Sequence, residues 1–424
     1  MARVLFGMLG LAVLIAIAVA FSADRRRIDW RLVAVGMALQ LAFAAFVLLT
    51  PFGARIFGAL SEGFVALLGF TAQGSRFIFG ELASGQSLGF VFAFQVLPTI
   101  IFFASFMAVL YHLGIMQRVV EGMAWVITKL MRVSGAETLS VCANAFIGQT
   151  EAPLVVKPYV PRMTQSELLT LMVGGMATIA GGVLGAYVMM LGGSDPAQQA
   201  FYAKHLITAS IMAAPATLVI AKILEPEREE PLTLGRVRIE IERSTANVID
   251  AAAAGAADGL RLALNVGAML LAFIALIALL NAPLTWLGEA TGLAAWLGRP
   301  TDLSTLLGLL LSPLAWLIGV PWQEADTIGG LIGVKVVLNE FVAYTQLAEK
   351  AAELSPESRL IATYALCGFA NFASIAIQIG GIGGIAPERR QDLARFGLKA
   401  VLGGSLVTFM TATIAGVLHG LGGG

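Results

Sequence analysis

The chain has 424 residues, of which 58% are hydrophobic and only 13% are charged, and its formal net charge is zero. Because a soluble domain carries about 25% charged residues, this composition predicts a polytopic membrane protein and excludes a soluble enzyme. The sequence contains no basic tract typical of nucleic-acid-binding proteins, so we expect no nucleic-acid partner. Its two cysteines and three histidines are too scattered for a metal-binding motif.

The first apolar run, residues 4–22, has one arginine before it, Arg3, and a cluster after it that begins at Arg25. A secretory signal peptide carries its positive charges first. Since positive residues favour the cytoplasmic side of a membrane, we expect a retained transmembrane span whose N-terminus is periplasmic.

Long apolar runs along the chain predict eight membrane-spanning helices. Pro98 lies inside the third run and is expected to kink it. Residues 54–72 are apolar but interrupted by charges, so we predict an interfacial helix there. The predicted spans are residues 4–22, 32–50, 88–111, 168–192, 206–224, 262–281, 358–380 and 398–418.

Two further apolar regions, residues 115–165 and 303–355, are broken by charges, glycines and prolines and do not fit as simple spans. If each region returns to the side where it started, most of the 27 Lys and Arg residues fall on cytoplasmic segments, as the positive-inside rule requires. We therefore predict two re-entrant hairpins. Residues 225–250 mix charges of both signs, and they predict a solvated cytoplasmic connection between two halves of the chain.

The two broken regions share one order of features, which predicts an internal repeat. The same spacing separates Thr138 from Glu151 and Thr327 from Glu340. An Ala-Trp pair precedes each copy, at 124–125 and 315–316. A helix start with capping residues follows it, at 164–167 and 355–358. The next span has a glycine-rich break, at 178–182 and 368–384. The predicted topology starts the first copy inside and the second outside. Such inverted repeats place substrate and ion sites at mid-membrane, between broken helices.

The repeat divides the chain into four expected parts. Residues 1–114 supply scaffold spans, and residues 115–224 form the first repeat with hairpin 1 and a broken fourth span. Residues 225–302 hold the cytoplasmic connection and the sixth span, which also belongs to the scaffold. Residues 303–424 form the second repeat with hairpin 2 and a broken seventh span.

The stretch from Asn144 to Pro153 carries the most unusual side chains for a membrane protein. Gln149 and Thr150 each offer a donor and an acceptor, whereas ionised Glu151 offers acceptors only. Ionisable residues at membrane depth are costly and usually functional. The stretch therefore predicts a binding site.

Two plainer interpretations of the same residues remain open at this point. The stretch could be a polar loop outside the membrane. Alternatively, Glu151 and Glu340 could be buried ion-pair partners of lysines such as Lys157 and Lys335.

Three motifs resemble the signatures of the concentrative nucleoside transporter family: Gly148–Pro153, Asn339–Tyr344 and Gly368–Ser374. The apolar segment Leu97–Phe103 is also similar, and the likeness extends over most of the chain. The resemblance implies a bacterial inner-membrane protein with eight spans that assembles as a homotrimer. It also implies inward transport of nucleosides on an ion gradient by an elevator motion, with no organic cofactor.

For the substrate, the resemblance implies a site in which hairpin 1 faces the nucleobase, and hairpin 2 with the seventh span faces the ribose. The implied base residues are Gln149, Thr150, Glu151 and Val183, and the implied ribose residues are Glu340, Phe369, Asn371 and Ser374. Asn371 and Ser374 are spaced i, i+3 and are expected to share a helix face. As alternatives, Ser374 bonds to its own helix carbonyls and Phe369 is an ordinary core residue.

For the coupling ion, the resemblance implies a sodium site between the tip of hairpin 1 and the break in the fourth span. The implied ligands are the Asn144 side chain, the Thr178 hydroxyl, and the carbonyls of Ile147 and Ile179. Relatives carry serine at the position of Thr178, and the hydroxyl survives that change. Unwound helix ends supply free carbonyl oxygens for such an ion.

Other functions stay open beside sodium-coupled nucleoside transport. Proton coupling and a nucleobase as the substrate are the closest alternatives. A channel and an intramembrane enzyme with paired carboxylates are more distant ones.

Overall fold

The computed structural model describes residues 2–83, 91–235 and 245–421. These residues form helices and no strand, and 8 of the helical segments are long and apolar enough to cross a membrane. The predicted all-α polytopic fold is therefore confirmed. Two parts of the predicted topology, residues 88–90 of the third span and 236–244 of the connection, lie outside the described residues.

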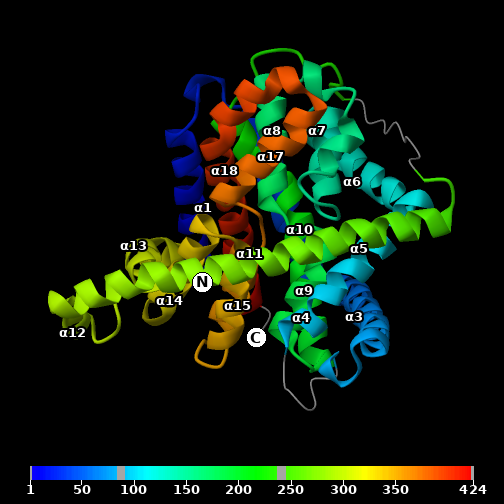
Figure 1. Ribbon diagram of the computed structural model, residues 1–424. Helices are drawn as coiled ribbons and strands as arrows, with labels where there is room; N and C mark the ends of the chain where they lie inside the picture. The colour runs from blue at the N-terminus through cyan, green and yellow to red at the C-terminus, as the bar shows by residue number, and fades with distance from the viewer. Residues whose placement is uncertain (1, 84–90, 236–244, 422–424) are drawn as a thin grey trace.

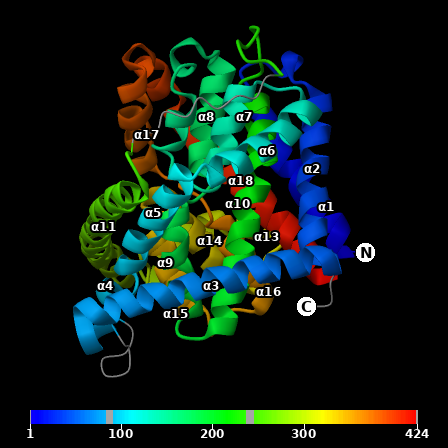
Figure 2. The same cartoon turned by 90° about the vertical axis from the view of Figure 1, so that its right-hand side faces the viewer.

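In the N-terminal part, the described residues form five α-helices: α1 (Ala2–Ala20), α2 (Trp30–Leu49), α3 (Pro51–Phe79), α4 (Phe92–Gln95) and α5 (Leu97–His112). By length and composition α3 qualifies as a span, but Figure 2 shows it lying across α1 and α2, as expected of the predicted interfacial helix. Pro98 occupies the first turn of α5, where a missing N–H costs nothing. The helix is interrupted at Val96, two residues before Pro98, so the third span does break next to the proline, but near the start of its described part and not at its middle.

The first repeat follows the predicted order. It comprises α6 (Ile115–Met131), α7 (Gly135–Asn144), two 3-10 turns (Ala152–Val156 and Val160–Arg162), α8 (Gln165–Ala177), α9 (Gly181–Gly192) and α10 (Pro196–Leu224). Ser134 and Glu137 form a capping box that starts α7. The returning arm of hairpin 1 contains no α-helix, because its prolines remove backbone donors. The fourth span breaks at residues 178–180, as predicted.

The second repeat has the same order with a more regular hairpin. It comprises α13 (Leu303–Leu317), α14 (Trp322–Val337), α15 (Glu340–Lys350), α16 (Pro356–Ala365), α17 (Phe372–Ile385), a 3-10 turn (Pro387–Arg389) and α18 (Arg390–Leu421). A bend of 116° separates α13 from α14. The seventh span breaks at residues 366–371, as predicted, but Gly380–Gly384 lie within α17, so the break is shorter than expected.

The two repeats are inverted with respect to each other. In Figure 2, α8 lies above α9 whereas α17 lies above α16, so the two broken spans run in opposite directions. The repeats also form the core of the molecule. In three segments, namely α8 together with α9, then α10, and then α18, 83–89% of the residues in the most apolar 18-residue stretch are buried. The corresponding share is 17–33% in the segments of α1, α2, α3, α5 and α11 (Val248–Ala290).

The helix between the repeats, α11, is followed by the short α12 (Leu293–Leu297). It has 43 residues, and at about 1.5 Å per residue it is roughly 65 Å long, so it extends well beyond the predicted span at 262–281. Figure 1 shows it crossing the molecule. A Cβ at Gly255 would lie 2.6 Å from Ala108 Cβ of α5. This small-residue contact lets α11 and α5 pack closely, as membrane helices often do.

Candidate functional site

The breaks in the helices are held by asparagine caps that aim polar side chains at one place. Asn339 Oδ1 accepts a 2.9 Å hydrogen bond from Val342 N, which makes Glu340 the first residue of α15. Asn371 Oδ1 accepts a 2.9 Å bond from Ser374 N at the start of α17. Asn371 and Ser374 are therefore neighbours because one caps the helix of the other, and not because both lie on a helix face.

Glu340 is buried, and its two carboxylate oxygens accept hydrogen bonds from two different elements. Tyr187 of α9 donates its hydroxyl to Oε1 at 2.8 Å. Asn371 Nδ2 donates to Oε2 at 3.2 Å. A buried charge is tolerated only when such donors replace water. Glu340 is thus fixed in place, and its remaining lone pairs stay available to a ligand.

Gln149 at the tip of hairpin 1 is held by two residues of α17. Its Nε2 donates to Ser374 Oγ at 3.1 Å, so Ser374 bonds across to hairpin 1 and not back to its own helix. Its Oε1 accepts from Gln378 Nε2 at 3.1 Å, and Gln378 also donates to Met172 O of α8 at 3.0 Å. These bonds fix which side of the Gln149 amide donates and which accepts.

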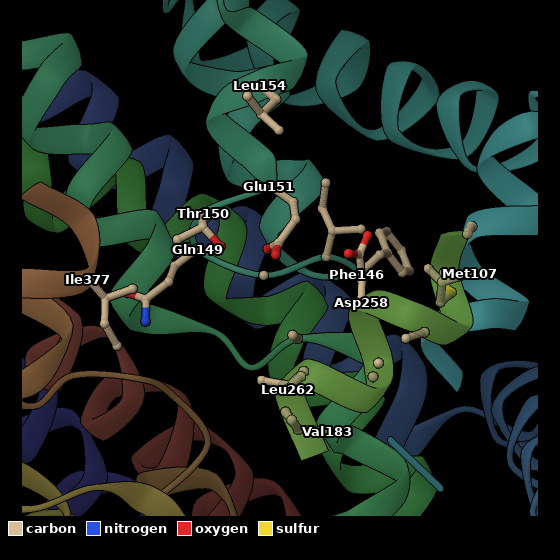
Figure 3. Close-up of a pocket in the computed structure, with 18 of the residues that line it drawn as sticks. Met107, Phe146, Gln149, Thr150, Glu151, Leu154, Val183, Asp258, Leu262 and Ile377 are labelled. Atoms are coloured by element: carbon tan, nitrogen blue, oxygen red, sulfur yellow. The ribbon is translucent and has the colours of Figure 1, made fainter. Parts of the chain in front are cut away.

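One cavity of about 1240 Å³ lies beside these residues. Hairpin 1 and the broken spans form one wall, and α5 and α11 form the opposite wall, with Met107, Asp258 and Leu262 among the lining residues. Figure 3 shows Gln149, Thr150 and Glu151 on one side and Asp258 and Leu262 on the other. All eight residues implied for substrate binding line this cavity: Gln149, Thr150, Glu151, Val183, Glu340, Phe369, Asn371 and Ser374.

Two of the four residues implied for sodium, Asn144 and Thr178, are in contact next to the tip of hairpin 1. Asn144 and Thr178 are buried, and the Thr178 hydroxyl donates to Asn144 O at 2.9 Å. Ile147 and Ile179 lie in the two irregular segments that follow α7 and α8. Asn144 Oδ1 is buried and has no hydrogen-bond partner among the described residues. An orphaned buried oxygen on a residue that also contacts the Thr178 hydroxyl fits a hard cation, which takes oxygen ligands.

The ion-pair interpretation of the two glutamates does not hold. Among the described residues, no ion pair involves Glu151 or Glu340. Lys335 Nζ instead donates to Ala365 O at 2.9 Å and to Thr408 Oγ1 at 3.1 Å. Glu151 is exposed at the cavity. Gln149 in the same stretch is buried against α17, so the stretch is not a free polar loop on the surface of the protein.

Two residues of the site were missed by the sequence analysis, Tyr187 and Gln378. Each lies one helical turn after a residue that was identified, since Tyr187 follows Val183 and Gln378 follows Ser374 at i, i+4. Each is also a polar side chain within an apolar span. That combination is the signal that could have found them.

Comparisons with known proteins cover the whole of this architecture. Three family models match the chain: "Na+ dependent nucleoside transporter N-terminus" over residues 9–82, "Nucleoside recognition" over 93–194, and "Na+ dependent nucleoside transporter C-terminus" over 205–416.

Several curated proteins are similar over nearly the full chain. An uncharacterized transporter of Haemophilus influenzae is 46% identical over 427 residues, with 99% of each chain covered. The nucleoside permease NupC of Helicobacter pylori is 42% identical, with 98% of each chain covered. Sodium/nucleoside cotransporter 1 of Mus musculus is 39% identical over 97% of this chain and 63% of that protein.

Solved structures of a protein named CNTnw are similar as well. One, in an inward-facing substrate-bound state, has a TM-score of 0.88 and 46% identity and covers 100% of this chain and 99% of that chain. Another, a variant in an outward-facing state, has a TM-score of 0.90 and 45% identity, with 99% of each chain covered. Together with the cavity and the inverted repeats, these similarities establish that the chain belongs to the family of sodium-dependent, concentrative nucleoside transporters and is a nucleoside transporter, not an enzyme.

Proposed function

We propose that this protein imports nucleosides across the bacterial inner membrane by symport with sodium. The observation that carries the proposal is the hydrogen bond between Gln149 and Ser374, which joins the tip of hairpin 1 to the seventh span in the wall of the cavity. Asn144, with its orphaned oxygen, lies in the same short segment as Gln149. An ion that orders this segment also orders one half of the nucleoside site.

The nucleobase binds at the tip of hairpin 1 in this proposal. Gln149 retains one amide hydrogen and part of its carbonyl after its two protein bonds, Thr150 offers a hydroxyl, and Glu151 offers acceptors. A neutral base needs such donors and acceptors and no countercharge. Val183, at the start of α9, packs against the base plane.

The ribose binds on the other side of the cavity. A carboxylate has about four lone-pair sites, and Glu340 uses one on each oxygen for Tyr187 and Asn371. The remaining acceptors suit the two vicinal hydroxyls of ribose and form charge-assisted bonds, which are stronger than neutral ones. Ser374 contributes a hydroxyl, and Phe369 packs beside the sugar.

Transport follows an elevator motion in this proposal. Residues 115–224 and 303–424, which contain both hairpins and both broken spans, move as one body. The N-terminal spans and α11 remain as the scaffold, which assembles as a homotrimer, with a periplasmic N-terminus. The close contact between α11 and α5 supports this division, because the pair forms the cavity wall that faces both repeats.

The coupling is tested by titrating sodium against uridine binding to the purified protein. We expect uridine affinity to rise with sodium and to be lost when choline replaces sodium. Equal affinity in the two buffers would refute sodium coupling, and uptake on a proton gradient alone would favour proton coupling. Competition by uracil and uridine separates a nucleobase carrier from a nucleoside carrier.

The ribose site is tested by Glu340→Gln, which keeps the shape of the side chain and removes the charge. We expect uridine uptake to be lost while the folded oligomer is retained in size-exclusion chromatography. Glu353→Gln, at an exposed position in the turn after α15, is the matched control and should transport like the wild type. Uptake retained in Glu340→Gln would remove this residue from the ribose site.

A further inference from the structure

Lys335 is a fully buried lysine that the transport mechanism has not used so far. It lies in the last turn of α14, and its side chain is 0% exposed. Its ammonium group donates to Ala365 O at 2.9 Å and to Thr408 Oγ1 at 3.1 Å, and it lies 6.0 Å from the ring centre of Phe409. Ala365 is the last residue of α16. The ammonium therefore lies at the negative end of a half-helix, at the break in the seventh span.

The corresponding place in the first repeat is the proposed sodium site. Aligning the two helix starts, Thr164 with Ser355, pairs Gly174 with Ala365. In the first repeat the Gly174 carbonyl accepts from the Thr178 hydroxyl at 3.2 Å. Ala365 O, which accepts from the Lys335 ammonium, thus corresponds to Gly174 O, which accepts from the hydroxyl of Thr178, one of the residues implied for sodium.

The side-chain ligands implied for sodium do not recur in the second repeat. The hairpin alignment, Thr138 with Thr327, pairs Asn144 with Gly333, and the broken spans pair Thr178 with Phe369. Neither glycine nor phenylalanine has a side-chain oxygen. The second repeat therefore keeps the carbonyl at the helix end, lacks the side-chain ligands for an ion, and places a lysine at that carbonyl instead.

We propose that Lys335 is a tethered cation that does permanently in the second repeat what a bound sodium ion does in the first. The proposal rests on the proposed sodium site of hairpin 1. The ammonium group of Lys335, in hairpin 2, joins this hairpin to the seventh span and to α18 through two hydrogen bonds. Hairpin 2 is then ordered with or without sodium, and only hairpin 1 responds to the ion. Transport consequently uses one sodium ion per nucleoside.

The lysine also balances the charge of hairpin 2. Lys335 and Glu340 lie on opposite sides of the break between α14 and α15, so the tip carries one charge of each sign. A tip with no net charge crosses the membrane interior at lower cost than a tip with an unbalanced carboxylate. Lys335 thus balances the charge of Glu340 as well as substituting for an ion.

The experiment uses the full-length protein and chemical rescue. Lys335→Ala removes the end of the side chain, and propylammonium chloride can restore both its length and its charge. We expect Lys335→Ala to bind uridine at least about tenfold more weakly at saturating sodium, and propylammonium to restore most of the loss. The neutral analogue 1-propanol should not restore it, and Lys335→Arg should retain part of the affinity.

Lys399→Ala is the matched control. Lys399 Nζ also donates to the last carbonyl of a helix, Leu224 O of α10, at 3.2 Å, but it pairs with Glu225 and does not lie at the break of a span. This variant should bind uridine like the wild type and show no response to propylammonium. A structural effect common to all lysines at helix ends would instead weaken both variants.

The wild-type protein supplies a second test that needs no variant to fold. Sodium dependence of uridine binding should give a Hill coefficient of about one. A coefficient near two, rescue by propanol as well as by propylammonium, or wild-type affinity in Lys335→Met would overturn the tethered-cation proposal alone. Uridine binding that is indifferent to sodium in the wild type would overturn the proposed coupling, and propylammonium rescue would still decide the role of Lys335.

Discussion

The hydroxyl of Tyr187 donates a 2.8 Å hydrogen bond to Glu340 Oε1, so a residue of the first repeat holds the buried carboxylate of the second. The Tyr187 ring also packs against the Tyr344 ring, with ring centres 4.6 Å apart and the planes tilted by 35°. The position of the carboxylate therefore depends on the packing of α9 against hairpin 2.

Tyr187→Phe removes this bond and keeps the ring. A hydrogen bond to a charged group contributes about 1.5–3 kcal/mol, so we expect uridine affinity to fall roughly 10–100-fold with little change in the sodium concentration for half-saturation. Isothermal titration calorimetry at saturating sodium measures the uridine affinity, and the same titration repeated over a series of sodium concentrations gives the half-saturating sodium concentration. Tyr344→Phe is the control, since Tyr344 donates to Thr363 O at 2.7 Å; it should lower stability more than affinity.

Thr178→Val tests the proposed sodium site by changing one of its implied ligands. The substitution removes a hydroxyl from the implied ligand set and keeps the branched shape. We expect the half-saturating sodium concentration to rise about tenfold or more, since one lost polar contact costs roughly 1–3 kcal/mol. Uridine affinity at saturating sodium should change little. Thr178→Ser keeps the hydroxyl and should titrate like the wild type; an unchanged titration in Thr178→Val would exclude this hydroxyl as a ligand.

Gln378→Leu tests how base selectivity is set. Gln378 orients the Gln149 amide, and without it the amide is free to present either its donor or its acceptor. We expect the affinity ratio between uridine and cytidine, whose bases exchange a donor and an acceptor at ring positions 3 and 4, to shrink about three- to tenfold, or by roughly 1 kcal/mol. Competition against labelled uridine measures the ratio. Gln199→Leu, which loses a bond to Gly193 O outside the cavity, should leave the ratio unchanged.

Gly175→Ala tests the close approach between hairpin 1 and α17. A Cβ at Gly175 would lie 2.5 Å from Gln378 Nε2 and 2.9 Å from Gln149 Cβ. Such overpacking costs about 1–3 kcal/mol, and because it displaces Gln149, we expect weaker uridine binding together with a lower melting temperature. Gly122→Ala in α6 has nothing within 4 Å and should be neutral or slightly stabilising. Normal uridine binding by Gly175→Ala would show that the contact is not needed.

Sequence patterns were sufficient to predict where the chain stops being helical. Glycine, proline and capping residues act locally, so the breaks after Ala177 and Ala365 and the start of hairpin 1 could be located from spacing alone. The distribution of Lys and Arg between the predicted cytoplasmic and external segments indicated that the two repeats are inverted with respect to each other. The eight substrate residues came from the resemblance, and the structure places them around one cavity.

Features that depend on tertiary packing could not be predicted in the same way. Gln378 was missed because its two partners, Gln149 and Met172 O, lie in distant segments. The length of α11 was underestimated because only its most apolar part fits a span. The irregular second arm of hairpin 1 and the regular α15 of hairpin 2 also differ although their spacing is the same, since prolines occur in only one of them.

Three of the bonds that build the site run between the repeats. Tyr187 of the first reaches Glu340 of the second, and Ser374 and Gln378 of the second reach Gln149 of the first. A chain of half this length would therefore carry no complete nucleoside site. An ancestral protein with a single repeat would have needed a second copy in the opposite orientation in the same membrane. Gene duplication and fusion would then have joined in one chain the two repeats that the site requires.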